Sequence, residues 1–278
     1  MAEFTPMMQQ YLQTKEEYKD CILFYRLGDF YEMFFEDAEL VSKELELTLT
    51  GKNCGMEERA PMCGIPYHAV EGYLNKLVAN GHKVAICEQV EDPKLAKGLV
   101  KREVIRIVAP GTNLDMQALD ESKNNYIMCI VYLADRYGVS IADVSTGDYY
   151  VTEVDSERKL FDEITKFSPS EIICNESFYM SGVDIEDLRH RLKITIYALE
   201  TWYFGDELAE TTLLTHFKVK SLEALGLADY DCGMIAAGAL LKYLYETQKN
   251  DLNNISVIHP YSTGKYMIID SSTRRNLE

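Results

Sequence analysis

The sequence predicts an α/β protein built from two main units. Its 278 residues correspond to about two domains, and 47% hydrophobic residues are enough for packed cores. Short apolar runs alternate with segments of helical periodicity, and the polar stretch 112–125 interrupts this alternation. We therefore expect domains at 1–115 and 126–250, a linker at 116–125, and the beginning of a further domain at 251–278.

The first unit is expected to begin with a helix. Thr5 can accept a hydrogen bond from a free helix amide, and Pro6 fits the first helical position. Apolar periodicity and Gly or Pro punctuation predict the other elements, which are a strand at 21–27, an apolar segment at 30–35, a helix at 36–47, a Gly/Pro-rich loop at 50–68, a helix at 69–80, and strands at 83–90 and 103–109. Together these elements make an α+β domain with a mixed sheet.

The second unit is expected to begin with an antiparallel meander. Apolar runs at 126–134, 139–144 and 149–154 are joined by short turn-like segments that contain Asp and Gly. Helices and strands then alternate as in a mixed α/β sheet, with helices at 156–167, 184–192, 206–217 and 231–249 and strands at 171–174 and 194–199. Small residues, among them Gly238, allow the last helix to pack closely.

Residues 251–278 are expected to begin a further domain. Two strands are predicted at 256–258 and 266–269, followed by the start of a helix at 274–278. A helix that begins in the last five residues predicts a chain that continues beyond Glu278.

The net charge of −17 limits what the chain can bind without a dedicated site. Non-specific nucleic-acid binding requires clustered Lys and Arg, so a DNA-binding function must come from a local site. Residues 1–115 hold 13 Lys and Arg against 19 Asp and Glu, and residues 116–250 hold 12 against 23. The strongly acidic second unit therefore favours a protein-docking surface over a DNA-facing one.

Seven cysteines are spread along the chain with no CxxC pair, which gives little support for a zinc knuckle or a redox dithiol. We expect free thiols in a reducing cytoplasm and no bound metal, although Cys54 and Cys63 flank one loop that could hold one. No apolar run reaches 18 residues and the first residues are polar, so neither a membrane span nor a signal peptide is expected.

Several sequence strings carry a resemblance to a known family. They are GDFYEMF at Gly28–Phe34 and the segments Pro61–His68, Ala85–Gln89, Arg106–Thr112 and Asp143–Gly147. In this order they resemble the N-terminal part of the MutS family of DNA mismatch-repair proteins, and the resemblance covers essentially the whole chain. It implies a mismatch-recognition domain, then a connector domain with an RNase H-like fold, then the start of the family's core domain.

The resemblance also implies partners. Mismatched double-stranded DNA would bind the first domain, and MutL would bind the connector. A full-length protein would be a dimer and a DNA-dependent ATPase that uses ATP, ADP and Mg²⁺. The chain itself is expected to be neither an enzyme nor bound to a cofactor, because Gly51-Lys52 and Gly264-Lys265 lack the remaining residues of a GxxxxGK[ST] phosphate-binding loop.

The resemblance implies that Phe30 and Glu32 form the family's Phe-x-Glu reader. Inserted from the minor groove, Phe30 would stack on a base and kink the duplex, which is easiest where pairing is already broken. Glu32 would be repelled by phosphates, so it would add discrimination at a cost in affinity, by accepting a hydrogen bond from a displaced base or, if protonated, donating one. Alternation places both on one side of an extended segment, with Tyr31 opposite.

Other residues are weaker candidates for DNA contacts. Leu27 directly precedes the reader turn and could touch the minor groove or simply pack. Five basic residues could hold phosphates or could lie on a solvated surface: Arg59, Lys94, Lys97, Lys101 and Arg102.

Three alternative functions stay open at this point. Asp143, Asp148 and Asp231 could belong to an RNase H-like metal-dependent nuclease, although Asp143 could equally be bonded in a turn with Ser145 or Thr146. A MutS homologue with a recombination role generally lacks the Phe-x-Glu reader. A structural interaction module would bury Phe30 in its core, as is usual for a Phe in an apolar run. The exposure of Phe30 separates these alternatives most directly.

Overall fold

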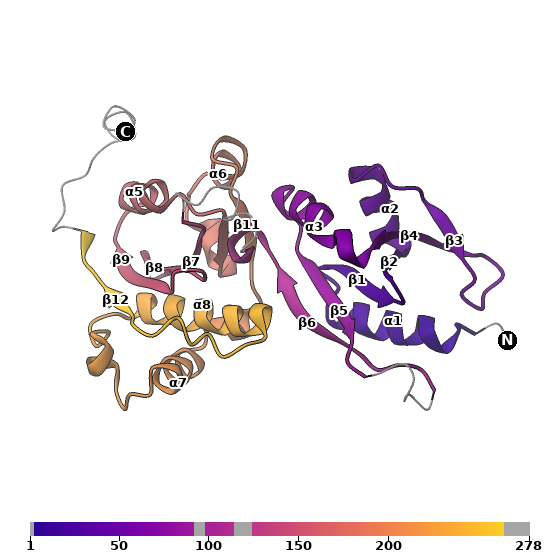
Figure 1. The fold of residues 1–278 in the computed structure, drawn as a ribbon. Coiled ribbons are helices and arrows are strands. Elements are labelled where there is room, and N and C mark those ends of the chain that lie inside the picture. Colours follow the sequence, from indigo (N-terminus) through magenta and orange to yellow (C-terminus); the bar gives the residue numbers. More distant parts are fainter. Residues whose placement is uncertain (1–2, 92–97, 114–123, 264–278) are drawn as a thin grey trace. The chain divides into compact units, whose positions relative to one another are not determined.

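The computed structural model describes residues 3–91, 98–113 and 124–263, which form two compact units that divide near residue 120 (Figure 1). Each unit contains a six-stranded mixed sheet with helices, so the predicted α/β class is confirmed. Most of the expected linker, the predicted strand at 266–269 and the helix start at 274–278 lie outside the described residues.

The first unit is built on one sheet with the strand order β3-β4-β2-β1-β5-β6. Its elements are α1 (Pro6–Glu17), β1 (Ile22–Leu27), β2 (Phe30–Phe34), α2 (Phe35–Glu44), β3 (Thr50–Lys52), β4 (Ala60–Pro66), η1 (Tyr67–Ala69), α3 (Val70–Ala79), β5 (Val84–Gln89), β6 (Arg102–Val108) and η2 (Pro110–Thr112). Strands β1 and β5 are parallel and every other pair is antiparallel. The predicted first helix is confirmed, since the Thr5 hydroxyl accepts a hydrogen bond from the Met8 amide at 3.4 Å.

Two apolar clusters cover the two faces of this sheet. On one face, Tyr11 of α1 packs edge-on against Tyr25 and Phe34. On the other face, Tyr31 and Met33 of β2 pack with buried residues of α2 and α3. Because side chains alternate along a strand, Phe30 and Glu32 share the α1 face with Phe34.

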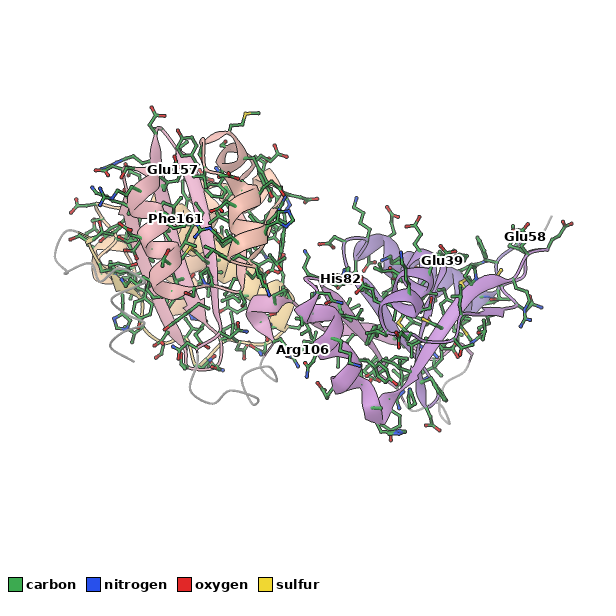
Figure 2. All side chains as sticks on the ribbon, turned by 90° about the horizontal axis from the view of Figure 1, so that it is seen from above. Glu39, Glu58, His82, Arg106, Glu157 and Phe161 are labelled. Carbon is green, nitrogen blue, oxygen red and sulfur yellow. The ribbon has the colours of Figure 1, made fainter. Side chains whose placement is uncertain are left out.

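The expected loop at 50–68 is wrong over most of its length, because it contains the hairpin of β3 and β4. Cys63 and Ile65 are buried on the side of the sheet that faces α2 and α3, as strand alternation requires. Pro61 and Pro66 lie near the two ends of β4, where a missing amide disturbs a sheet least. The connection between the two strands is exposed except at the buried Cys54, and Figure 2 labels Glu58 within it.

The second unit has the strand order β11-β10-β7-β8-β9-β12. Its elements are β7 (Tyr126–Leu133), β8 (Arg136–Asp143), β9 (Asp148–Val154), α5 (Glu157–Phe167), β10 (Glu171–Cys174), η3 (Glu176–Met180), α6 (Ile185–Arg191), β11 (Thr195–Ala198), η4 (Thr201–Phe204), α7 (Asp206–Phe217), η5 (Leu222–Leu225), α8 (Cys232–Gln248) and β12 (His259–Pro260). The predicted meander is confirmed, since β7, β8 and β9 pair antiparallel in sequence.

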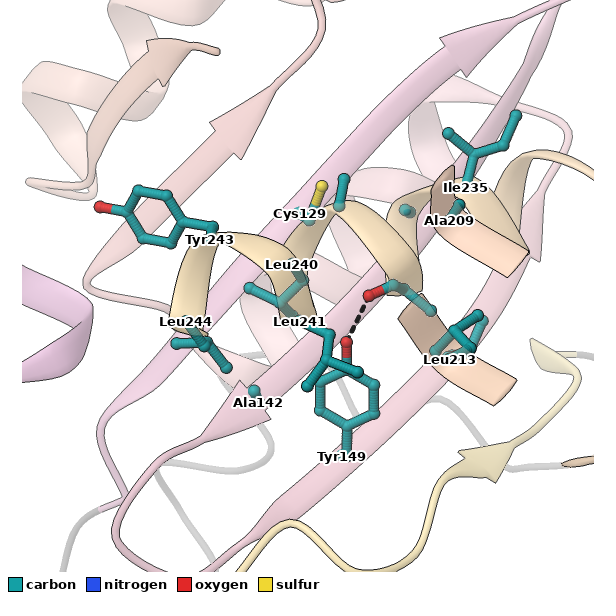
Figure 3. Packing of buried hydrophobic residues seen from close by; sticks show 14 of the residues in the cluster. Cys129, Ala142, Tyr149, Ala209, Leu213, Ile235, Leu240, Leu241, Tyr243 and Leu244 are labelled. Atoms are coloured by element: carbon teal, nitrogen blue, oxygen red, sulfur yellow. Dashed lines mark hydrogen bonds between the residues drawn. The ribbon is translucent and has the colours of Figure 1, made fainter. Parts of the chain in front are cut away.

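Helices α7 and α8 cover one face of the second sheet, and α5, η3 and α6 cover the other. The Tyr149 hydroxyl of β9 donates to the Ala237 carbonyl of α8 at 2.5 Å, which the dashed line marks in Figure 3. Gly238 lies directly against Ala209 of α7, so the expected close packing of the last helix is confirmed.

The predicted strand at 256–258 is wrong. The strand is the two-residue β12, which pairs in parallel with β9. Ile255 and Ile258 are buried whereas Val257 is 53% exposed, a spacing of three residues that does not fit the two-residue period of a strand. Over the ranges that the structure describes, no helix combines the length and apolar character needed to cross a membrane.

Candidate nucleic-acid interface

A tight turn presents the candidate reader at one end of the first sheet. Strands β1 and β2 are joined by Gly28 and Asp29 alone, with Leu27 paired to Phe30. Gly28 has a φ of +59°, which glycine adopts at little cost. The Tyr67 amide donates to the Asp29 carbonyl at 2.9 Å, so β4 and its extension also hold the turn.

Phe30 is the solvent-exposed aromatic residue of β2. Its exposed fraction is 46%, whereas those of Tyr31 and Phe34 are 5% and 1%. Leaving about half of a Phe side chain in water forgoes roughly 1 kcal/mol of burial energy. The interpretation of Phe30 as a core residue is therefore wrong, and its ring is available to a ligand.

Glu32 lies on the same face as Phe30 and forms an ion pair with Lys52 of β3. The exposed fractions of the two charged side chains are 17% and 32%, so the pair is half-buried. Gly64 of β4 lies opposite Glu32, and a Cβ atom there would lie 3.6 Å from Glu32 Cγ and 3.9 Å from Phe30 Cδ1. Gly64 therefore adds no side chain over Phe30 and Glu32, the two candidate reader residues.

The opposite face of the turn is tied down by a polar cluster. The Arg26 guanidinium lies 3.9 Å from the centre of the Tyr67 ring, pairs with Glu88 at 3.2 Å and donates through Nε to the Gly28 carbonyl at 2.5 Å. The Tyr31 hydroxyl donates to the same Glu88 carboxylate. Burial and Glu88 raise the pKa of Tyr31 above its usual range, so this hydroxyl stays a donor at neutral pH. The contacts of Arg26, Tyr31 and Glu88 thus hold the turn on the face opposite to the exposed Phe30.

Two family models match the chain, one described as MutS domain I over residues 5–117 and one described as MutS domain II over residues 125–256. The chain belongs to the MutS family. Phe30 and Glu32 lie in MutS domain I, and the acidic second unit corresponds to MutS domain II.

Curated MutS relatives match the chain over its whole length. Proteins named DNA mismatch repair protein MutS are 66% identical in Lachnoclostridium phytofermentans, 52% identical in Acetivibrio thermocellus and 50% identical in Ruminiclostridium cellulolyticum. The chain spans 30% of the first of these proteins and 32% of the other two.

The remaining candidate DNA-contact residues in MutS domain I differ in their solvent exposure and in their side-chain partners. Leu27 is half-buried beside Phe30, and Arg59 is exposed on the β3–β4 connection. Lys101 is exposed but pairs with Glu103 at 2.5 Å. Lys94 and Lys97 lie outside the described residues.

Arg102 is held inside the domain. Its Nε donates to the Arg26 carbonyl at 2.7 Å and its Nη1 donates to Gln10 Oε1 at 3.1 Å. The guanidinium also lies 5.3 Å from the centre of the Tyr25 ring. These contacts join α1, β1 and β6, so Arg102 stabilises the fold of the domain. Its position in a basic stretch of the sequence did not predict this role.

Asp143 in MutS domain II is buried in a turn and not in a metal site. Its Oδ1 accepts hydrogen bonds from the Ser145 amide at 2.8 Å, the Ser145 hydroxyl at 2.7 Å and the Thr146 amide at 3.3 Å. Its Oδ2 accepts one from the Asn125 amide at 3.1 Å. The turn interpretation is confirmed. Among the described residues, no group of three or more His, Cys, Asp or Glu side chains is placed to hold a metal ion.

Lys52 is the functional candidate that sequence reasoning missed. Its contact with Glu32 depends on the β3–β4 hairpin, which folds Lys52 back toward β2 over a separation of 20 residues. The signal was the short run without charged residues at 60–66, which predicts a strand once the prolines are assigned to its ends.

Proposed function

We propose that the chain is the mismatch-reading and connector part of a longer DNA mismatch-repair protein. One observation carries this proposal: a half-exposed Phe30 at a tight turn, on the same face as Glu32. The proposed divisions are a reader domain at 1–115, a linker at 116–125, an RNase H-like connector at 126–250 and the start of a core domain at 251–278.

Phe30 acts as a wedge in this proposal. Opening one base step costs a few kcal/mol in paired DNA and less where pairing is already broken. Stacking a base on the ring returns roughly 1–3 kcal/mol. The two terms nearly cancel on matched DNA, so insertion is favoured where a mispair has weakened the step. A mispaired step also bends more easily, which lets one ring accept many mispairs.

Glu32 distinguishes a displaced mispaired base by hydrogen bonding to it. Its side chain lies on the same face of β2 as Phe30, so it can accept a hydrogen bond from a base N–H that normal pairing would hide. Close to phosphates the same carboxylate weakens binding to all DNA. Glu32 therefore contributes selectivity rather than affinity.

Phosphate contacts must come from a small part of the surface, because the chain carries a net charge of −17. Arg59, Lys101 and Leu27 are the described residues that could border the duplex, and Lys94 and Lys97 extend this set. We expect further contacts from the rest of the longer protein.

The second unit is proposed as the connector that receives MutL and relays nucleotide state. Its acidic composition suits a protein partner. In this proposal the longer protein is a dimeric ATPase that binds ATP, ADP and Mg²⁺ outside this chain. A cytoplasmic location agrees with the seven cysteines, which are all free and buried.

The test is Phe30→Ala in the full-length protein, with affinities measured on a duplex with one mispair and on its matched counterpart. Losing the stack should weaken mismatch binding by roughly 5- to 150-fold and change matched binding far less. Ile105→Ala is a matched control, because Ile105 is a 47% exposed apolar residue of the same unit on β6. An unchanged mismatch preference in Phe30→Ala would refute the proposal.

A further inference from the structure

We propose that Lys52 is a positioning residue that holds the Glu32 carboxylate in its reading position and thereby sets the discrimination between mismatched and matched DNA. This inference rests on the proposed function of Phe30 and Glu32. Its basis is the half-buried ion pair between Lys52 Nζ and Glu32 Oε2.

The sheet allows this contact because of what lies between the two residues. Lys52 is on β3 and Glu32 is on β2, and both strands pair with β4. Lys52 lies opposite Ala60 and Glu32 lies opposite Gly64, four residues further along β4, and both of these β4 residues are small. Met62 lies between them on the same face, so the lysine side chain reaches the carboxylate diagonally across β4.

The pair uses only one side of the carboxylate. Oε2 accepts the Lys52 ammonium, whereas Oε1 has no hydrogen-bond partner among residues 3–91, 98–113 and 124–263. The side chain is thus fixed in one orientation with one oxygen left for a base. A free glutamate would sample several rotamers and would lose conformational entropy when it engaged a base.

Charge gives the pair a second effect. Glu32 alone would bring a negative charge close to the phosphates that flank the insertion point. The ammonium of Lys52 compensates that charge locally, and it lies 5.6 Å from the centre of the Phe34 ring, against the same face of β2. Removal of Lys52 should therefore weaken binding to both duplexes and weaken mismatch binding more.

A double-mutant cycle in the full-length protein tests the inference. Lys52→Met, Lys52→Arg, Glu32→Gln and the Lys52→Met/Glu32→Gln double variant are compared by the ratio of matched to mismatched dissociation constants. We expect Lys52→Met to reduce this ratio at least about threefold, and Lys52→Arg to retain it. In the Glu32→Gln background, Lys52→Met should change the ratio less than about twofold, because the partner is already lost.

Other results would overturn the inference. If Lys52 instead contacts a phosphate, Lys52→Met will lower both affinities equally in both backgrounds and will reduce the salt slope by about one. An unchanged ratio in Lys52→Met also contradicts it. Lys76→Met controls for the loss of one positive charge, since Lys76 is exposed on α3, and near-identical circular dichroism establishes that each variant is folded.

Phe30→Ala, measured in parallel, separates the two proposals. If Phe30→Ala keeps the mismatch preference, the proposed function fails. If Phe30→Ala loses the preference while Lys52→Met keeps it, only the role of Lys52 fails.

Discussion

Replacing Gly238 with alanine should destabilise the second unit, because helices α7 and α8 touch through this residue. A Cβ atom at Gly238 would lie 2.3 Å from Ala209 Cα, 2.4 Å from Ala209 Cβ and 2.8 Å from the Ala209 carbonyl oxygen. Ordinary contact begins near 3.4 Å, so one helix must move by about 1 Å relative to the other. Figure 3 shows Ala209 close to α8.

Two opposing terms set the size of the effect. Overpacking of this kind costs about 1–3 kcal/mol, whereas replacing a helical glycine by alanine gains up to about 1 kcal/mol. The expected net loss is about 1–2 kcal/mol in the free energy of unfolding, which corresponds to a fall in Tm of roughly 3–10 °C.

Differential scanning calorimetry of the chain measures this change. Gly72→Ala is the matched control, because Gly72 lies in helix α3 and a Cβ atom there would meet nothing within 4 Å. Gly72→Ala should leave the transition unchanged or raise it slightly. If Gly238→Ala behaves like this control, the two helices do not approach as closely as described, and the packing argument is refuted.

Three further predictions concern the reader, the chain alone and the thiols. In the full-length protein, Glu32→Gln should narrow the affinity gap between mismatched and matched duplexes, and an unchanged ratio in binding isotherms would contradict the selective role of Glu32. The chain alone should bind a mismatched duplex only weakly at physiological salt, because of its net charge of −17, so a submicromolar dissociation constant by fluorescence anisotropy would count against this reasoning. Burial raises the pKa of Cys87 and that of Cys174 to about 12. A thiol is neutral below its pKa, so at pH 8 Ellman's reagent should label these cysteines far more slowly in the folded chain than in urea, and equal rates would show that they are accessible.

The elements of the second unit were largely predictable because each follows one local pattern. Apolar runs joined by turn segments predict β7 to β9, and the structure places these strands within three residues of the predicted bounds. In the first unit, glycines and prolines at 50–68 indicated a loop, whereas pairing with β2 turns 60–66 into a strand. The strand forms there because hydrogen bonding to a strand distant in sequence outweighs the turn preference of the glycines and prolines.

The candidate site was predictable only in part for the same reason. The positions of Phe30 and Glu32 on one face follow from alternation within a single strand. The pairing of Lys52 with Glu32 follows from a strand register, and that of Arg102 with Gln10 spans 92 residues. Contacts of this kind depend on tertiary structure, which no local window contains.

The interior position of β2 fixes the number of residues in the strand that carries Phe30 and Glu32. Strand β2 is hydrogen-bonded on both edges, to β1 and to β4. An insertion or deletion of one residue inside it would turn every following side chain to the opposite face, sending the carboxylate into the apolar cluster and a buried residue into water. Such a protein can therefore vary this surface by substitution at Phe30 and Glu32, but not by changing the number of residues in β2.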